Sequence, residues 1–232
     1  MNTTEKNLIN KCLKLSSDAY SDDKSFISNN QAYVEYKENK TIYIAFRGSD
    51  DIIDWIDNTK LGFVSHNGVL VHGGFYNALK ECLPFISGFI SRHYDYGDKF
   101  LLTGHSKGSA MALLMGNDLI SQGYLNSSIH FVGFATPRVI KTSSVELFNR
   151  HRFNILLCEL EGDPVPSLPR QYMGYSKVYD KIKIKKMSWW RKLIGFRAYN
   201  HKLSEYMKKF YTRESFIVTK FKSIRARMGV RG

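Results

Sequence analysis

Apolar residues recur along this chain with two different periods, and together these periods predict alternating helices and strands. Between residues 5 and 19, apolar side chains return every three to four positions, which is typical of an amphipathic helix. Two segments in which apolar and polar residues alternate, 32–37 and 41–47, are joined by Glu38-Asn39-Lys40 and predict a hairpin at the edge of a sheet.

The middle of the chain continues this pattern with longer elements. Residues 75–93 have helical spacing, and Pro84 predicts a kink or a break within them. Residues 129–135 and 153–160 are continuous apolar runs, typical of strands covered on both faces, with a short helix predicted near 144–149 between them. The pattern therefore predicts one α/β domain with a mixed, mainly parallel sheet flanked by helices.

The most informative segment is a strand, a sharp turn and a helix between Lys99 and Gly116. An apolar run, 100–102, enters Gly104-His105-Ser106-Lys107-Gly108, and an apolar helical pattern follows. In a G-x-S-x-G turn the two glycines let strand and helix pass closely, and the serine stands exposed on a strained bend above the sheet. Ser106 is therefore a candidate nucleophile.

A serine nucleophile needs a base, usually a histidine that is itself oriented by a carboxylate. In hydrolases with this turn the acid follows the serine and the histidine comes last. His130 lies inside an apolar run and His151 lies between two arginines just before a strand, so we interpret both as structural. His201 is the remaining histidine after Ser106 and is the candidate base.

Asp163 is the best placed carboxylate. It follows the apolar run 153–158 and a turn at Gly162, and Pro164 stops the strand from continuing. This is the carboxyl end of a strand, where open α/β sheets build their sites. Asp163 is therefore the candidate acid of a Ser-His-Asp triad.

Several blocks of this sequence resemble class 3 lipases, the α/β-hydrolases related to fungal triacylglycerol lipases. The blocks are the G-x-S-x-G turn, Ile44-Ala45-Phe46-Arg47-Gly48-Ser49 followed by Asp54-Trp55-Ile56, Val71-His72-Gly73-Gly74-Phe75, Ala135-Thr136-Pro137-Arg138-Val139, and Gly162-Asp163-Pro164-Val165-Pro166-Ser167-Leu168-Pro169. Asn200-His201-Lys202-Leu203 with Tyr206 looks like the block of the catalytic histidine. The resemblance covers residues 1–210. It implies the α/β-hydrolase fold, with Ser106 as nucleophile, His201 as base and Asp163 as orienting acid.

The resemblance also implies an oxyanion hole, formed by the hydroxyl or N–H of Ser49 and the backbone N–H of Lys107. Losing one such donor typically costs about 3 to 4 kcal/mol of barrier. The chain departs from the family pattern at Lys107, where the family usually has an apolar residue, and at Ser109, where it usually has glycine. Two readings of the Lys107 side chain are open, extension to solvent and contact with an anionic head group.

The segment from Asp50 to Asn58 matches the position of the family's lid. Four apolar residues recur there at helical spacing among four acids. They are Ile52, Ile53, Trp55 and Ile56. The resemblance favours a lid, and an ordinary amphipathic surface helix is the alternative.

Composition fits one enzyme domain, since 232 residues of which 43% are apolar bury one sizeable core. The three cysteines, Cys12, Cys82 and Cys158, are widely spaced in apolar contexts, which predicts buried free thiols and a reducing compartment. With no signal peptide and no apolar run approaching about 18 residues, we expect a cytoplasmic or peripherally membrane-bound protein. Nucleotide, zinc and calcium motifs do not occur in the sequence, so we expect no cofactor and no metal.

The basic charge is concentrated at the end of the chain. Residues 171–232 carry 17 Lys and Arg against three acids, a net +14, whereas residues 1–170 carry 17 against 18. A basic aromatic insertion, 181–197, lies between Asp163 and His201, and a basic tail, 211–232, ends the chain. Cations around adjacent tryptophans are typical of an anchor on an anionic membrane. The candidate contacts are Lys183, Lys185, Lys186, Trp189, Trp190, Arg191 and Lys192.

Other interpretations of this charge are a solvated basic face with the tryptophans packed inward, and a contact with nucleic acid through residues 220–231. Two functions therefore compete. One is a serine lipase or phospholipase that docks on anionic membranes; the other is a non-hydrolytic protein whose basic region binds nucleic acid or a protein partner. We favour the enzyme, because the second function gives no reason for Ser, Asp and His in the catalytic order.

Overall fold

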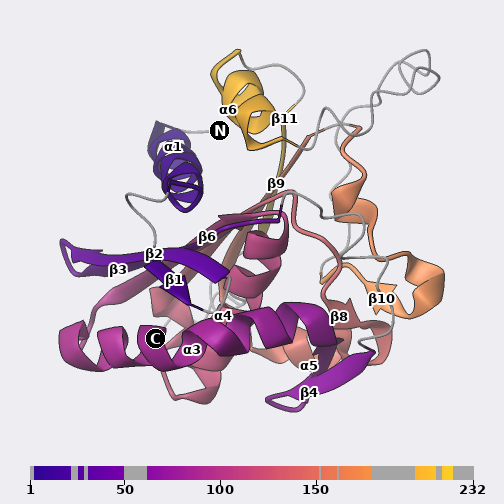
Figure 1. Cartoon of the computed structure of the whole chain (residues 1–232), viewed down its shortest axis with the longest axis horizontal. Helices are drawn as coiled ribbons and strands as arrows, with labels where there is room; N and C mark the ends of the chain where they lie inside the picture. Colours follow the sequence, from indigo (N-terminus) through magenta and orange to yellow (C-terminus); the bar gives the residue numbers. More distant parts are fainter. Residues whose placement is uncertain are drawn as a thin grey trace, which may run out of the picture.

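The chain folds around a central mixed sheet. The structure, a computed structural model, describes residues 3–21, 26–28, 31–49, 62–151, 153–160, 162–178, 202–212 and 216–221. The sheet has the order β1-β2-β3-β6-β7-β9-β11 (Figure 1). Its strands are β1 (Phe26–Ser28), β2 (Gln31–Glu38), β3 (Thr41–Phe46), β6 (Lys99–His105), β7 (Ile129–Phe134), β9 (Asn154–Leu160) and β11 (Phe216–Phe221).

The four central strands, β3, β6, β7 and β9, are parallel, and antiparallel strands extend the sheet on both sides. This confirms the mixed, mainly parallel sheet, and β2 and β3 form the predicted hairpin. The expected edge position of that hairpin is wrong, because the three residues of β1 pair outside β2. A strand of three residues carries no period that a sequence pattern can reveal.

Helices cover both faces of the sheet. Helices α1 (Thr3–Asp18) and α6 (Leu203–Thr212) lie on one face, and α3 (Gly73–His93) and α4 (Lys107–Ser121) lie on the other (Figure 1). The remaining α-helix of the described chain, α5 (Val145–Arg150), matches the short helix predicted before β9. Helix α3 runs unbroken through Pro84.

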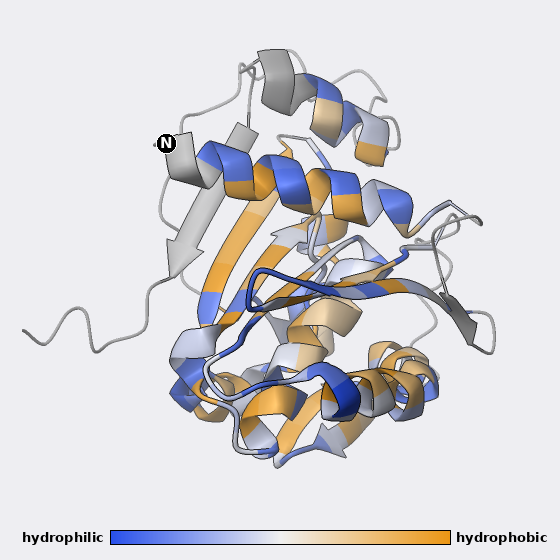
Figure 2. Cartoon of the chain, turned by 90° about the vertical axis from the view of Figure 1, so that its left-hand side faces the viewer, coloured by the Kyte–Doolittle hydropathy of each residue, from blue (hydrophilic) through white to orange (hydrophobic). Residues whose placement is uncertain are grey.

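The alternation along β3 shows how the sheet separates two apolar layers. Ile42, Ile44 and Phe46 pack with α3 and α4, whereas Tyr43 and Ala45 pack on the side of α1. Figure 2 shows the apolar strands between the two helical layers. Helices cover both faces of β7 and β9, which explains why the apolar runs of these strands are continuous.

A second, smaller sheet and several short 3-10 turns complete the described structure. The sheet has the order β10 (Tyr175–Ser176), β8 (Ile140–Lys141), β5 (Val69–His72) and β4 (Phe63–His66). His72 caps the start of α3, since its Nδ1 accepts a hydrogen bond from the Gly74 N–H at 3.1 Å. Burial lowers the pKa of His72 to about 4, so the imidazole is neutral and able to accept this bond. The 3-10 turns are η2 (Asn126–Ser128), η3 (Thr142–Ser144), η4 (Val165–Ser167) and η5 (Gln171–Met173).

The C-terminal part of the chain, although strongly basic, contributes a strand to the central sheet. Residues 216–221, which the sequence assigns to a basic tail, form β11 and pair antiparallel with β9. Cys12, Cys82 and Cys158 are free and buried, as predicted. Over the described ranges, no helix combines the length and the apolar character that a membrane crossing needs.

Candidate active site

Ser106 occupies the sharp turn between β6 and α4 that the sequence predicts. Its backbone has φ 59° and ψ −124°, a region that costs a residue other than glycine about 1 to 3 kcal/mol. The Ser106 N–H donates to the carbonyl of Phe134 at 2.9 Å, which ties the turn to the end of β7. The surrounding fold therefore holds the serine in a conformation that the residue alone would not adopt.

The two glycines of the turn are required by close backbone contacts. A Cβ on Gly104 would lie 2.4 Å from the carbonyl carbon of Gly108, and a Cβ on Gly108 would lie 2.1 Å from the carbonyl oxygen of Phe46. Real Cβ atoms do not approach other heavy atoms so closely. Both glycines thus allow α4 to begin directly against β6 and β3, as the G-x-S-x-G pattern predicts.

The expectation that Ser106 stands exposed is wrong, because its exposed fraction is 0%. The sequence reveals the turn, but not which distant segments cover it. One covering segment follows β3, where a Cβ on Gly48 would lie 3.4 Å from the Cβ of Ser106. Gly48 precedes Ser49, so the chain that carries the candidate oxyanion donor runs beside Ser106.

Asp163 lies three residues beyond the end of β9, at the carboxyl edge of the parallel strands, and is 8% exposed. Its Oδ1 accepts a hydrogen bond from the Val165 N–H at 2.9 Å, and its Oδ2 accepts one from the Tyr206 hydroxyl at 2.6 Å. Two donors on two oxygens fix the orientation of the carboxylate. The structure therefore gives Asp163 the buried, oriented setting that the acid of a triad requires.

Tyr206 reaches Asp163 from α6 and is fully buried. Its hydroxyl also accepts a hydrogen bond from the Leu160 N–H at 3.1 Å, so it links α6 to the end of β9. Burial, followed by the charge of Asp163, raises the pKa of Tyr206 well above its ordinary value, and the phenol stays protonated as a donor. The sequence places Tyr206 in a block that resembles the family, but it does not indicate a role for the hydroxyl.

His105 precedes Ser106, the candidate nucleophile, and contacts two tyrosines. Its Nδ1 lies 3.2 Å from the Tyr20 hydroxyl, and its ring meets Tyr206 edge to face at 5.6 Å between centroids. The Arg47 guanidinium lies over the Tyr20 ring at 5.4 Å. The segment after α1, the segment after β3 and α6 therefore meet around the turn. The sequence does not predict this contact of Tyr20, since nothing in the neighbouring residues distinguishes it from other tyrosines.

Lys107 is the first residue of α4, and its side chain does not extend to solvent. The residue is 8% exposed, and its Nζ donates to Oε1 of Gln31 at 2.8 Å. Burial lowers the pKa of Lys107. The amide of Gln31 stabilises the ammonium at this depth, which a sequence pattern cannot show because the two residues are 76 positions apart. The backbone N–H of Lys107, the candidate oxyanion donor, does not depend on the side chain.

Ser109, the second departure from the family pattern, has a structural explanation. Its hydroxyl lies 2.6 Å from the hydroxyl of Thr136 in the buried contact between α4 and the chain after β7. A Cβ on Gly133 would lie 2.5 Å from the Ser109 hydroxyl oxygen. The serine thus fits beside a glycine and forms a hydrogen bond, so it needs no catalytic role.

Several predicted site residues lie outside the residues that the structure describes. They are His201, the candidate lid residues Ile52, Ile53, Trp55 and Ile56, and the candidate membrane contacts Lys183, Lys185, Lys186, Trp189, Trp190, Arg191 and Lys192. Of the two histidines interpreted as structural, His151 bonds through Nδ1 to the Asn117 side chain, and burial lowers the pKa of His130. In the described part of the chain, no group of three or more His, Cys, Asp or Glu side chains is arranged to hold a metal ion.

Known proteins are similar to this chain in sequence and in fold. It is 27% identical over 170 residues to the secreted mono- and diacylglycerol lipase A of Penicillium cyclopium, covering 69% of this chain and 53% of that protein. It is 24% identical over 177 residues to phospholipase A1-IIgamma of Arabidopsis thaliana, covering 62% of this chain and 42% of that protein. The chain thus spans about half the length of the first relative and less of the second.

The Rhizomucor miehei triacylglyceride lipase has a similar structure, with a TM-score of 0.67 and 24% identity over 75% of this chain and 78% of that one. This likeness confirms the α/β-hydrolase fold. The profile of the family described as "Lipase (class 3)" matches residues 43–173, which is more than half of the chain. The turn around Ser106 and the candidate acid Asp163 both fall within that match, and the chain belongs to the class 3 lipase family.

Proposed function

We propose that this protein is a serine hydrolase that cleaves carboxylic esters of lipids through Ser106, His201 and Asp163. The observation that carries the proposal is the strained turn that holds Ser106, together with an Asp163 carboxylate oriented by two hydrogen bonds at the same edge of the sheet. An inert binding protein gives no reason for a strained serine and a buried, oriented carboxylate in the chain order of a hydrolase.

The proposed reaction has two steps. His201 removes the proton from the Ser106 hydroxyl while Oγ attacks the ester carbonyl, and it then returns that proton to the departing alcohol. Water next gives a proton to His201 and attacks the acyl carbonyl, and His201 passes that proton to the Ser106 oxygen as the acyl–serine bond breaks and the fatty acid leaves. Asp163 orients the imidazole and stabilises its positive charge. The N–H of Lys107 and the hydroxyl or N–H of Ser49 stabilise the oxyanion that forms in each step.

The described contacts of Tyr206 support the assignment of His201. Tyr206 is bonded to Asp163, and its own N–H and that of Glu205 donate to the carbonyl of Lys202. The first turn of α6 therefore begins close to the Asp163 carboxylate, and His201 is the residue immediately before Lys202 in the sequence.

The proposed substrates are acylglycerols and phospholipids, because the relatives named above act on these classes. We propose in addition that the basic insertion 181–197 docks the enzyme on anionic membranes and that the segment 50–58 acts as a lid. A nucleophile with 0% exposure supports a lid, because a lipid reaches Ser106 only when some covering segment moves.

Hydrolysis of a soluble ester tests the proposed chemistry. The wild-type protein is expected to hydrolyse p-nitrophenyl butyrate, and Ser106→Ala is expected to abolish that activity. Ser121→Ala is the matched control, because Ser121 is an exposed serine at the end of the same helix that Ser106 precedes. Full activity in the Ser106→Ala protein would overturn the assignment.

Docking is tested with the same enzyme on two substrates. Replacing Lys183, Lys185, Lys186 and Lys192 by glutamine is expected to reduce hydrolysis of acidic phospholipid vesicles at low salt, with little effect on the soluble ester. Physiological salt, with a Debye length of about 8 Å, is expected to shrink the difference. Equal losses on both substrates would show instead that the segment supports the fold.

A further inference from the structure

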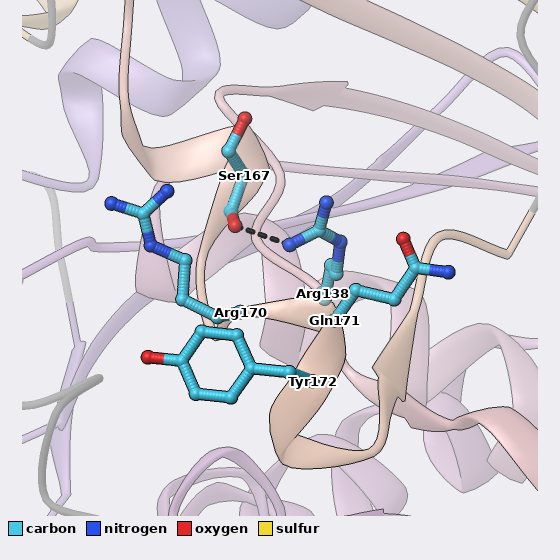
Figure 3. A pocket seen from close by; sticks show the side chains of 5 residues that line it. All are labelled: Arg138, Ser167, Arg170, Gln171 and Tyr172. Atoms are coloured by element: carbon cyan, nitrogen blue, oxygen red, sulfur yellow. Dashed lines mark hydrogen bonds between the residues drawn. The ribbon is translucent and has the colours of Figure 1, made fainter.

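A cavity of about 500 Å³, open to the surface, lies outside the proposed catalytic triad. It is lined by Arg138, Ser167, Arg170, Gln171 and Tyr172 (Figure 3). Arg138 comes from the chain between β7 and β8, and Ser167 ends η4. Arg170 directly precedes η5, and Gln171 and Tyr172 belong to η5. In Figure 3 the two guanidinium groups lie on either side of Ser167.

The cavity adjoins the segment that holds the catalytic acid. The Val165 N–H that donates to Asp163 begins η4, and Ser167, which lines the cavity, ends it. Arg138 secures the same segment, because its Nη1 donates to the carbonyls of Ser167 and Pro169. Ser167 is therefore four residues from Asp163 along the chain, and Arg138 fixes the position of the segment that carries both residues.

The charges around the cavity favour an anion. Arg138 and Arg170 repel each other, and burial together with the charge of Arg170 lowers the pKa of Arg138. The carboxylate whose charge most favours the Arg138 cation is that of Glu159, and both of its oxygens already accept from Lys177, at 2.8 and 2.9 Å. An anion between the two arginines would remove this repulsion.

Hydrogen-bond donors are available for such an anion. Both described bonds of the Arg138 guanidinium come from Nη1, and the described part of the chain makes no use of its Nη2 and Nε donors. The Arg170 side chain is exposed, and its guanidinium forms no hydrogen bond or ion pair with the described residues. Tyr172, which is 87% exposed, and Gln171 add a hydroxyl and an amide.

The arrangement is better suited to phosphate than to carboxylate. One guanidinium fork satisfies the two oxygens of a carboxylate, whereas a phosphate offers enough acceptor oxygens for two forks and a hydroxyl. We propose that Arg138 and Arg170, with Tyr172 and Gln171, bind a phosphate group, either that of a phospholipid or free phosphate. With a lipid ligand, the site deepens the proposed function, because it makes phospholipids a preferred substrate class.

Ligand binding to the Ser106→Ala variant of this chain tests the proposal without hydrolysis. The probes for isothermal titration are sodium phosphate, dihexanoyl phosphatidic acid below its critical micelle concentration, and dihexanoylglycerol as the neutral counterpart. We expect phosphatidic acid to bind, and we expect Arg170→Gln to weaken that binding at least fivefold. Any binding of dihexanoylglycerol is expected to be unchanged by the substitution. Arg170 is the residue to change because, unlike Arg138, it holds no part of the fold.

Arg150→Gln is the matched control. It removes the same single charge from an exposed arginine on α5, whose described partner is Glu146 in the next turn of the helix. Binding that changes less than twofold in this variant supports a specific site. Equal weakening by both substitutions would overturn it, since general attraction to a basic protein would then explain the binding.

The two sources of phosphate give different outcomes. Binding of sodium phosphate with the same dependence on Arg170 supports a site for free phosphate, whereas binding of phosphatidic acid alone supports a lipid headgroup site. Absence of both overturns the proposal. The assay uses an inactive variant, so its result does not depend on hydrolysis. If this variant binds phosphate while the wild-type protein fails to hydrolyse esters, the proposed function is refuted and the phosphate site still stands.

Discussion

Removing the Tyr206 hydroxyl tests whether the orientation of Asp163 matters for catalysis. In Tyr206→Phe, Oδ2 of Asp163 loses a donor at 2.6 Å, while the bond from Val165 to Oδ1 is kept. The ring still fills the same buried space between β9 and α6. The substitution therefore removes one hydrogen bond from the carboxylate without opening a cavity.

Two energies are at stake. A hydrogen bond to a charged group contributes about 1.5 to 3 kcal/mol. If all of this energy serves to orient Asp163, its loss raises the activation barrier by that amount and lowers kcat/KM by about 10- to 150-fold. The Leu160 N–H also loses its acceptor, and a buried unsatisfied donor costs about 1 to 3 kcal/mol of stability. In a domain of this size each kcal/mol lowers Tm by about 2 to 4 °C.

The assay is kcat/KM on a soluble ester, measured beside thermal unfolding of the same protein. Tyr96→Phe is the control, because the substitution also removes a tyrosine hydroxyl, but from a residue that is 93% exposed. In an Asp163→Asn background, Tyr206→Phe is expected to add little, since the two residues act as a unit. A Tyr206→Phe enzyme with wild-type kcat/KM, or additive losses in the double variant, would refute the reasoning.

Three further predictions concern stability. Gly104→Ala places a Cβ 2.4 Å from the Gly108 backbone, and we expect a loss above about 3 kcal/mol in urea unfolding, or no folded protein. Gln31→Ala removes an acceptor of the buried Lys107 ammonium and is expected to destabilise more than the double variant with Lys107→Met; the reverse order would contradict the contact. Burial raises the pKa of Glu35 from 4.5 to about 7, so the unfolded state ionises first and wild-type stability falls as pH rises from about 4.5 to 7. Glu35→Gln is expected to abolish that component, so its unfolding free energy relative to wild type rises over this window; an unchanged difference would contradict the assigned burial.

The sequence predicts the parts of the fold that depend on long or locally distinctive patterns. One example is the apolar runs of β7 and β9, because burial on both faces requires apolar residues at successive positions. Another is the turn around Ser106, because close backbone contacts require glycine at fixed positions. The strands β8 and β10 have two residues each and carry no such mark. The basic composition of the C-terminal segment also obscured β11.

Within the site, the sequence predicts positions better than environments. The setting of Asp163 at the end of β9 follows from local signals, namely an apolar run, a turn and a proline. The burial of Ser106 and Lys107 depends on distant segments, such as the chain after β3 and the start of β2. The contact between Tyr20 and His105 joins residues 85 positions apart, which a single sequence does not reveal.

Covalent labelling of the nucleophile tests the central claim most directly. A fluorophosphonate probe reacts with a serine that a neighbouring base has activated, and mass spectrometry of the digested protein identifies the modified residue. We predict one labelled peptide carrying the probe on Ser106, with labelling lost in Ser106→Ala and strongly slowed in His201→Ala and Asp163→Ala. Labelling of a different serine, or unchanged labelling in the Ser106→Ala protein, would contradict the account.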